Sequence, residues 1–124
     1  MKTFALALLC LLAACAQTTP TTLQERTWTG GLTPMNHPDR VMPITYEVRR
    51  VDGQLAVTLI ARDMQTPTRD ARVEGDTLSF VFNEPEAGVL LACALARQAD
   101  ERYAGRCVDA GGKWAHFTMT PPEG

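Results

Sequence analysis

The sequence is poor in the side chains that carry most enzymatic chemistry. Its 124 residues include one serine, Ser79, and two histidines, His37 and His116. The GxSxG, HExxH, Walker A and GxGxxG motifs and paired CxxC motifs are all absent, which removes the usual signatures of hydrolases, zinc enzymes and nucleotide-binding proteins. The alternation of its strand turns Ser79 outward. We therefore predict a non-catalytic protein with no cofactor.

Metal ligands are also scarce. Met35, His37 and Met42 lie within "MNHPDRVM" and could offer thioether and imidazole ligands to copper. Methionines near a proline-containing loop more often fill gaps in packing, and His116, beside Trp114, fits an exposed strand face. The sequence therefore predicts no metal site.

Long runs of one charge are missing as well. The formal net charge is −2, and it becomes −3 without the first 14 residues, because Lys2 leaves and no acidic residue does. A chain without a basic or acidic block gives no electrostatic argument for nucleic acid as a partner. Five arginines could form an anion site only if they converged, and the strand pattern favours scattered surface charges instead: Arg49, Arg62, Arg72, Arg97 and Arg106.

The longest apolar run is too short to cross a bilayer as a helix. It covers 13 residues, Phe4 to Ala16, whereas a transmembrane helix needs about 20. Lys2 precedes the run, and two alanines and Cys15 end it, which is the layout of a signal peptide.

Leu12, Ala13, Ala14 and Cys15 resemble the lipobox of bacterial lipoproteins. The resemblance implies removal of residues 1–14 and acylation of the Cys15 thiol, with ordinary secretory cleavage as the alternative. Two or three acyl chains would anchor the protein stably to a membrane. Ala16, rather than an aspartate, follows the cysteine, which by the same resemblance implies sorting to the outer membrane. Residues 15–24, which include "QTTPTT", are predicted to form a short extended tether.

Cys93 and Cys107 remain once Cys10 leaves with the signal peptide and Cys15 is acylated. An even pair in an exported protein indicates a disulfide. A hairpin centred on Asp100 places residues 93 and 107 opposite each other, at a Cα separation that a disulfide accepts. The alternative is a pair of buried free thiols.

The remaining chain, residues 25–121, reads as short strands separated by turns, such as Asp52-Gly53. Apolar and polar residues alternate in most of these runs, as in Ile44, Tyr46 and Val48. The pattern predicts eight strands, at about 26–32, 42–50, 55–62, 67–73, 77–83, 89–97, 102–108 and 113–119.

Closing the first strand onto the last would remove the sheet edges. We therefore predict an all-β, single-domain, antiparallel up-and-down barrel, with a two-sheet sandwich as the alternative. Such a barrel is filled by side chains or holds one small ligand, and its closure would make Trp28 and Trp114 neighbours. Residues 88–102 are rich in leucine and alanine and could form a helix, but the cysteine pairing favours a strand.

From Trp28 onward the order of features resembles a lipocalin-like, calycin-type barrel module of bacterial envelope proteins, found alone or fused to serine hydrolases. Its matching pieces include "TWTGGL", "LAVTLIA", "ARVEGDTLSFVF", "YAG" and "HFTM". Cys93 and Cys107 stand where that module commonly has a glycine and an aromatic residue, which puts an open interior at that end in doubt.

These features together predict a lipid-anchored envelope protein whose barrel binds a small apolar ligand or an envelope protein partner. The alternative is an accessory, structural or inhibitory surface domain associated with an envelope hydrolase. The sequence does not indicate which ligand or partner is bound.

Overall fold

The computed structural model describes residues 23–122, which fold into nine strands and no helix. No helix in this range could therefore span a membrane. The predicted signal peptide, Cys15 and most of the predicted tether lie outside the described residues. The strands are β1 (Thr27–Pro34), β2 (Met42–Val51), β3 (Gln54–Ala61), β4 (Met64–Pro67), β5 (Arg69–Glu74), β6 (Thr77–Asn83), β7 (Leu90–Arg97), β8 (Tyr103–Val108) and β9 (Trp114–Thr120).

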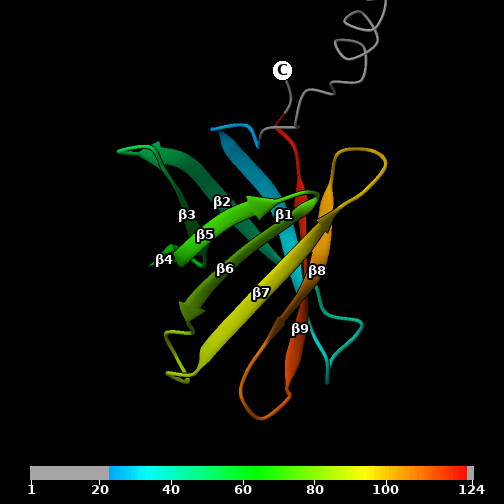
Figure 1. Cartoon of the computed structure of the whole chain (residues 1–124). Helices are drawn as coiled ribbons and strands as arrows, with labels where there is room; N and C mark the ends of the chain where they lie inside the picture. Colours follow the sequence, from blue (N-terminus) through cyan, green and yellow to red (C-terminus); the bar gives the residue numbers. More distant parts are fainter. Residues whose placement is uncertain (1–22, 123–124) are drawn as a thin grey trace, which may run out of the picture.

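The strands form one antiparallel sheet in the order β4-β3-β2-β1-β9-β8-β7-β6-β5. The first strand pairs with the last, from Thr29 opposite Thr120 to Pro34 opposite Ala115, so the sheet curls into a nearly closed barrel (Figure 1). The prediction of an all-β barrel closed between its first and last strands is confirmed. Residues 90–97 form a strand rather than a helix.

The barrel has two different ends (Figure 1). At the end that we call the termini end lie Leu23, the start of β1, the end of β9 and the hairpins β2–β3, β5–β6 and β7–β8. At the end that we call the open end lie the loops of residues 35–41, 84–89 and 109–113 and the turn at Arg62 and Asp63.

The predicted fourth strand, residues 67–73, corresponds to β5, but β4, which precedes it, is not among the eight predicted strands. β4 pairs with β3 after a two-residue turn at Arg62 and Asp63, both of which have positive φ. Thr68 then donates from its backbone N–H (3.0 Å) and its hydroxyl (2.6 Å) to the carbonyl of Val57. From Arg69 onward β5 pairs with β6 instead, with an irregularity in the register at Asp70 (φ 54°). The chain thus changes pairing partner partway along.

Tight curvature of the wall depends on two interior positions that carry no side chain. A Cβ built on Gly30 would lie 1.8 Å from the carbonyl oxygen of Thr118, and one on Gly105 would lie 2.0 Å from that of Ala94. Glycine kinks of this kind let a sheet coil enough to close. The ring of Tyr46 covers Gly30, and its hydroxyl donates to the Thr118 carbonyl at 2.9 Å.

We expect Gly30→Ala and Gly105→Ala each to lower the free energy of unfolding by about 3 kcal/mol or more, because the added methyl group meets backbone that cannot move aside. Urea titration followed by circular dichroism measures this. Gly111→Ala is the matched control, since a Cβ there would meet only the Asp109 side chain at 3.5 Å, and it should change stability by less than about 0.5 kcal/mol. Equal effects of the three variants would contradict the steric role.

Large aromatic side chains pack the termini end. Trp28 is buried, donates from its indole N–H to the carbonyl of Gln24 (3.0 Å) and contacts Tyr103 edge-on at 5.9 Å between ring centroids. Leu23 is also buried and belongs to the same core. The expected contact between Trp28 and Trp114 is wrong: β1 and β9 are antiparallel, and their register puts Trp114 beyond Pro34 at the open end.

The Cys93–Cys107 disulfide joins β7 to β8, with Cα atoms 4.0 Å apart and both residues buried. The two residues are directly opposite in the hairpin register, as predicted. A cross-link that closes a loop of this length stabilises a fold by about 3 kcal/mol in the chain-entropy treatment.

Burial raises the pKa of Tyr46 well above its ordinary value of 10.0. A group whose pKa is raised on folding destabilises the native state once the pH exceeds its unfolded value, because only the unfolded chain ionises readily. We therefore expect stability to fall as the pH rises above about 10. Tyr46→Phe should lose about 1 kcal/mol at neutral pH but show a shallower alkaline decline. Unfolding titrations from pH 7 to 11 with the same slope in both proteins would contradict this.

Candidate functional site

The most distinctive hollow in the molecule is a cavity of ≈430 Å³ at the open end. Its walls are mainly apolar side chains from seven strands, and it reaches down to Ile44, Leu59 and Phe117, which are almost fully buried. This size lies at the lower end of the roughly 300–1,000 Å³ typical of small-molecule sites. The barrel interior therefore opens into this cavity at one end, while a second, more polar hollow of ≈390 Å³ lies beside β2, β3 and β5 nearer the termini end.

A gradient in side-chain size explains why the cavity lies at the open end. The packed half is filled by buried side chains such as Tyr46, Phe80 and Tyr103. The cavity half has Ala61 and Ala115 at interior positions on β3 and β9, which leave space that no neighbour fills. The disulfide does not line the cavity, although Cys107 is paired in the register with Ala115, which does.

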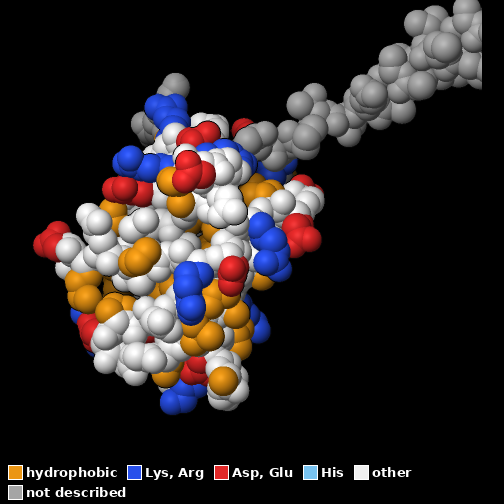
Figure 2. All heavy atoms as spheres, turned by 60° about the vertical axis from the view of Figure 1, so that its left-hand side comes forward, with side chains coloured by type: hydrophobic (Ala, Val, Ile, Leu, Met, Phe, Trp, Pro, Cys, Tyr) orange, Lys and Arg blue, Asp and Glu red, His pale blue; other side chains and the backbone are white. Residues whose placement is uncertain are grey.

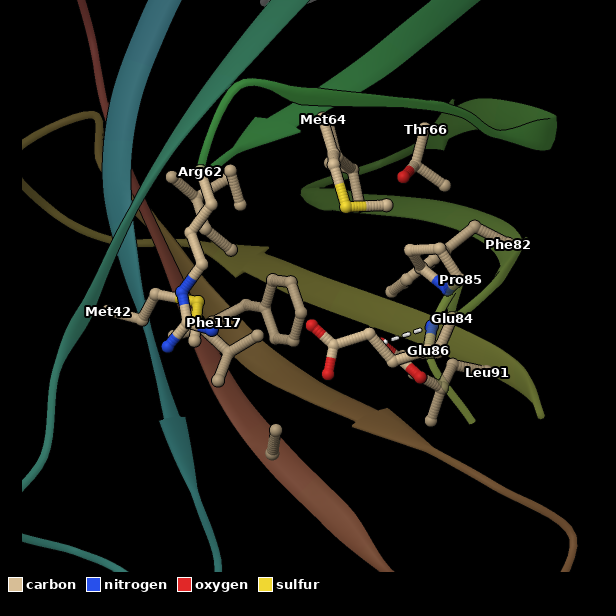
Figure 3. A pocket seen from close by; sticks show the side chains of 15 residues that line it. Met42, Arg62, Met64, Thr66, Phe82, Glu84, Pro85, Glu86, Leu91 and Phe117 are labelled. Carbon is tan, nitrogen blue, oxygen red and sulfur yellow. Dashed lines mark hydrogen bonds between the residues drawn. The ribbon is translucent and has the colours of Figure 1, made fainter. Parts of the chain in front are cut away.

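The cavity mouth carries opposite charges on opposite sides. Figure 3 shows Arg62, from the β3–β4 turn, on one side, and Glu84 and Glu86, from the loop between β6 and β7, on the other, with Phe117 between them. The Glu84 carboxylate accepts hydrogen bonds from the backbone N–H groups of Glu86 (3.1 Å) and Ala87, which hold it in place.

Exposed hydrophobic residues gather around the same end. Of the seven large hydrophobic side chains exposed within residues 23–122, six belong to the open end, and only Val51 lies at the termini end. Figure 2 shows exposed hydrophobic side chains in the lower half of one face, among scattered charged ones. The six residues are Met35, Val41, Met64, Val89, Leu90 and Val108.

The wall beside the cavity has a gap in its hydrogen bonding. β4 pairs with β3 but not with β6, and β6 pairs with β5 only as far as Arg69 opposite Val81. The cavity is lined here by Met64 and Thr66 on one side and by Phe82 and Pro85 on the other. Side chains alone close this part of the wall.

The residues considered as metal ligands do not form a site. Met42 lines the cavity, His37 lies in a neighbouring hollow, and the sulfur of Met35 accepts a hydrogen bond from the backbone N–H of Trp114 at 3.3 Å. His116 is exposed on the outer face of β9. Within residues 23–122, no cluster of three or more His, Cys, Asp or Glu residues could hold a metal ion.

The five arginines considered as an anion site are spread over the barrel. Arg49, Arg72 and Arg97 form ion pairs with Glu47, Glu74 and Glu101 in the half nearer the termini. The guanidinium of Arg106 lies 4.2 Å from the centroid of the Trp114 ring on the outer wall. Arg62 alone among the five lines the cavity.

The outer face of β7 departs from the expected polar pattern. Its outward residues are all exposed and all apolar, while Cys93 and Leu95 on its inner face are buried. Strands that are apolar on both faces are typical of sheets covered on both sides. The outward residues are Leu90, Ala92, Ala94 and Ala96.

The sequence reasoning did not find the residues that line the cavity. The signal available was the small size of Ala61 and Ala115 at inward positions near one end of their strands. That signal could be used only after the register had shown that both alanines lie at the same end. Glu84 and Glu86 lie within "EPEAG", a segment whose proline and glycine indicate a turn and carry no signal of a binding site.

Comparisons with known proteins support the fold alone. No family model matches the sequence, and no curated protein matches it. A solved structure of a redesigned β-barrel is similar, with a TM-score of 0.51 and 11% sequence identity, over 79% of this chain and 90% of that one. A likeness at this identity says nothing about ligand or activity.

Proposed function

We propose that the protein is a lipid-anchored protein of the bacterial envelope whose barrel binds one small apolar molecule in the cavity at the open end. The observation that carries the binding function is the ≈430 Å³ cavity, whose walls are mainly apolar and which reaches the buried core of the barrel. Apolar pockets with a few polar groups at the mouth are the usual form of small-molecule sites.

The position of the chain termini supports the combination of anchor and binding site. The segment before β1 is fixed across the termini end, where the carboxylate of Glu25 accepts a hydrogen bond from the backbone N–H of Arg50 (2.9 Å), and the carbonyl of Arg26 accepts one from that of Val48 (3.1 Å). A tether that precedes residue 23 would therefore leave the barrel from the packed end. The cavity would open at the opposite end, away from the attachment point.

The exposed hydrophobic residues of the open end also support ligand exchange there. Exposed apolar surface commonly marks a site of binding or transfer. A ligand of low solubility could pass from another apolar surface into the cavity without full exposure to water, which lowers the hydrophobic cost of the transfer.

Filling the cavity tests the binding function. We expect the full-length protein, extracted from its own membrane, to retain a small molecule that native mass spectrometry detects as an added mass. Ala61→Phe and Ala115→Phe should each reduce the bound fraction at least about tenfold, since the new ring occupies space that the ligand needs.

Ala92→Phe is the matched control, because it adds the same ring to the exposed outer face of β7, and it should retain the ligand. Thermal unfolding of all variants checks that the barrel remains folded. Wild-type protein without any added mass, or cavity-filled variants that bind as much as the wild type, would refute the proposal.

The lipid anchor has a separate test. Cells given an alkyne-labelled palmitate should incorporate the label into the wild-type protein and into Cys10→Ser, but not into Cys15→Ser, because only Cys15 would become the acylated residue. Equal labelling of Cys15→Ser and the wild type would show that the anchor is not at this cysteine.

A further inference from the structure

The charged residues of the barrel differ in their pairing between its two ends. All four ion pairs within residues 23–122 lie in the half nearer the termini, two of them in or beside the β7–β8 hairpin. Arg62, Glu84 and Glu86 at the cavity mouth belong to none of them. The mouth therefore holds charges of both signs that no described residue neutralises by direct pairing.

The two sides of the mouth are set apart by the architecture. Arg62 projects from the two-residue turn between β3 and β4, and Arg40 lines the hollow next to it. Glu84 and Glu86 belong to the loop between β6 and β7, across the part of the wall without backbone pairing (Figure 3). The acids next to the two arginines in sequence, Asp39 and Asp63, line neither hollow.

The position of one carboxylate is fixed before any ligand arrives. The backbone N–H groups of Glu86 and Ala87 hold the Glu84 carboxylate at the start of its loop. A preorganised charge loses little conformational freedom when a ligand of opposite charge binds, which favours recognition. A head group with a single negative charge would be attracted by Arg62 but repelled by Glu84 and Glu86. A head group with a single positive charge would be attracted by the two glutamates but repelled by Arg62.

The size of the cavity limits the apolar part of the ligand. At ≈430 Å³ it lies near the lower limit for drug-sized ligands. The rings of Phe82 and Phe117 both line it and contact each other edge-on, with 6.2 Å between their centroids, which narrows the space at this point. This space suits one alkyl chain better than two.

We infer that the ligand is a single-chain zwitterionic amphiphile, whose chain fills the cavity and whose head group places its anionic part beside Arg62 and its cationic part beside Glu84 and Glu86. This inference rests on the proposed binding function. It adds the class of ligand and the residues that select its head group.

The test uses four photoreactive probes that share a dodecyl chain with a diazirine at its end and differ only in the head group: phosphocholine, sulfate, trimethylammonium or hydroxyl. The full-length protein is labelled by light in its own membrane, and mass spectrometry locates the attachment site. Labelling of residues that line the cavity, and its loss in Ala115→Phe, separates binding in the cavity from background contact with the bilayer.

We expect the phosphocholine probe to label the cavity most efficiently. Arg62→Gln should reduce its labelling about two- to fivefold and shift the preference towards the trimethylammonium probe. Glu86→Gln should shift the preference towards the sulfate probe. These magnitudes follow from the usual strength of partly exposed charge contacts. Arg49→Gln, which removes a charge in the half nearer the termini, is the matched control and should not change the order of the probes.

The outcomes distinguish the two proposals. Cavity labelling that Ala115→Phe abolishes, but that is equal for all four head groups or unchanged by Arg62→Gln and Glu86→Gln, would overturn the head-group inference and leave the binding function intact. A preference for the sulfate or the trimethylammonium probe in the wild type would also overturn it. If no probe gives labelling that Ala115→Phe removes, the binding function itself fails.

Discussion

The structure depends on a steric constraint at two positions, Gly30 and Gly105, where the neighbouring strand's carbonyl occupies the space of a side chain. Closing a short barrel requires strong coiling, and coiling brings backbone into the interior at these points. The carbonyl of Thr118 that turns inward must still be hydrogen-bonded, and the Tyr46 hydroxyl satisfies it while the tyrosine ring covers Gly30. Closure of the barrel therefore depends on the same side chain, Tyr46, that packs the core next to Gly30. The half of the interior that contains Tyr46 is the half that side chains fill.

The open half follows from the same arrangement. Aromatic rings, together with the chain that enters at Leu23, fill the level of Tyr46 and Trp28, while alanines stand at inward positions near the other end. The disulfide between β7 and β8 lies in the buried core without lining the cavity. It can therefore stiffen the wall at no loss of cavity volume. The sequence resemblance suggested that Cys93 and Cys107 would leave less open space inside the barrel. The cavity at the open end is present despite the disulfide.

Much of this fold could be predicted from the sequence. Strands with one solvent-exposed face show an alternation of apolar and polar residues, and an antiparallel hairpin fixes which residue lies opposite each cysteine. The turn at Arg62 and Asp63 could not be predicted. Both residues adopt positive φ, yet arginine is not a residue that favours such turns. Without this turn β4 is left out of the predicted strands, and the predicted strand count is eight instead of nine. The Trp28–Trp114 contact failed for a related reason, since adjacency of two strands does not specify which ends of them meet. The cavity could not be predicted because it depends on register across the whole barrel rather than on any local motif.

The split between β4 and β5 leaves a gap in the backbone hydrogen bonding of the wall beside the cavity. A single continuous strand could pair with both β3 and β6 along their lengths, and its backbone hydrogen bonds would seal the wall. Here β4 stays with β3 and β5 with β6, so the wall between Thr66 and Phe82 is held by side chains alone. Segments with few backbone hydrogen bonds open at the lowest free-energy cost. The split that raises the strand count to nine therefore leaves a stretch of wall that would open more readily than the rest, and the ligand that we propose could enter there from the side, between Arg62 and the two glutamates of the mouth.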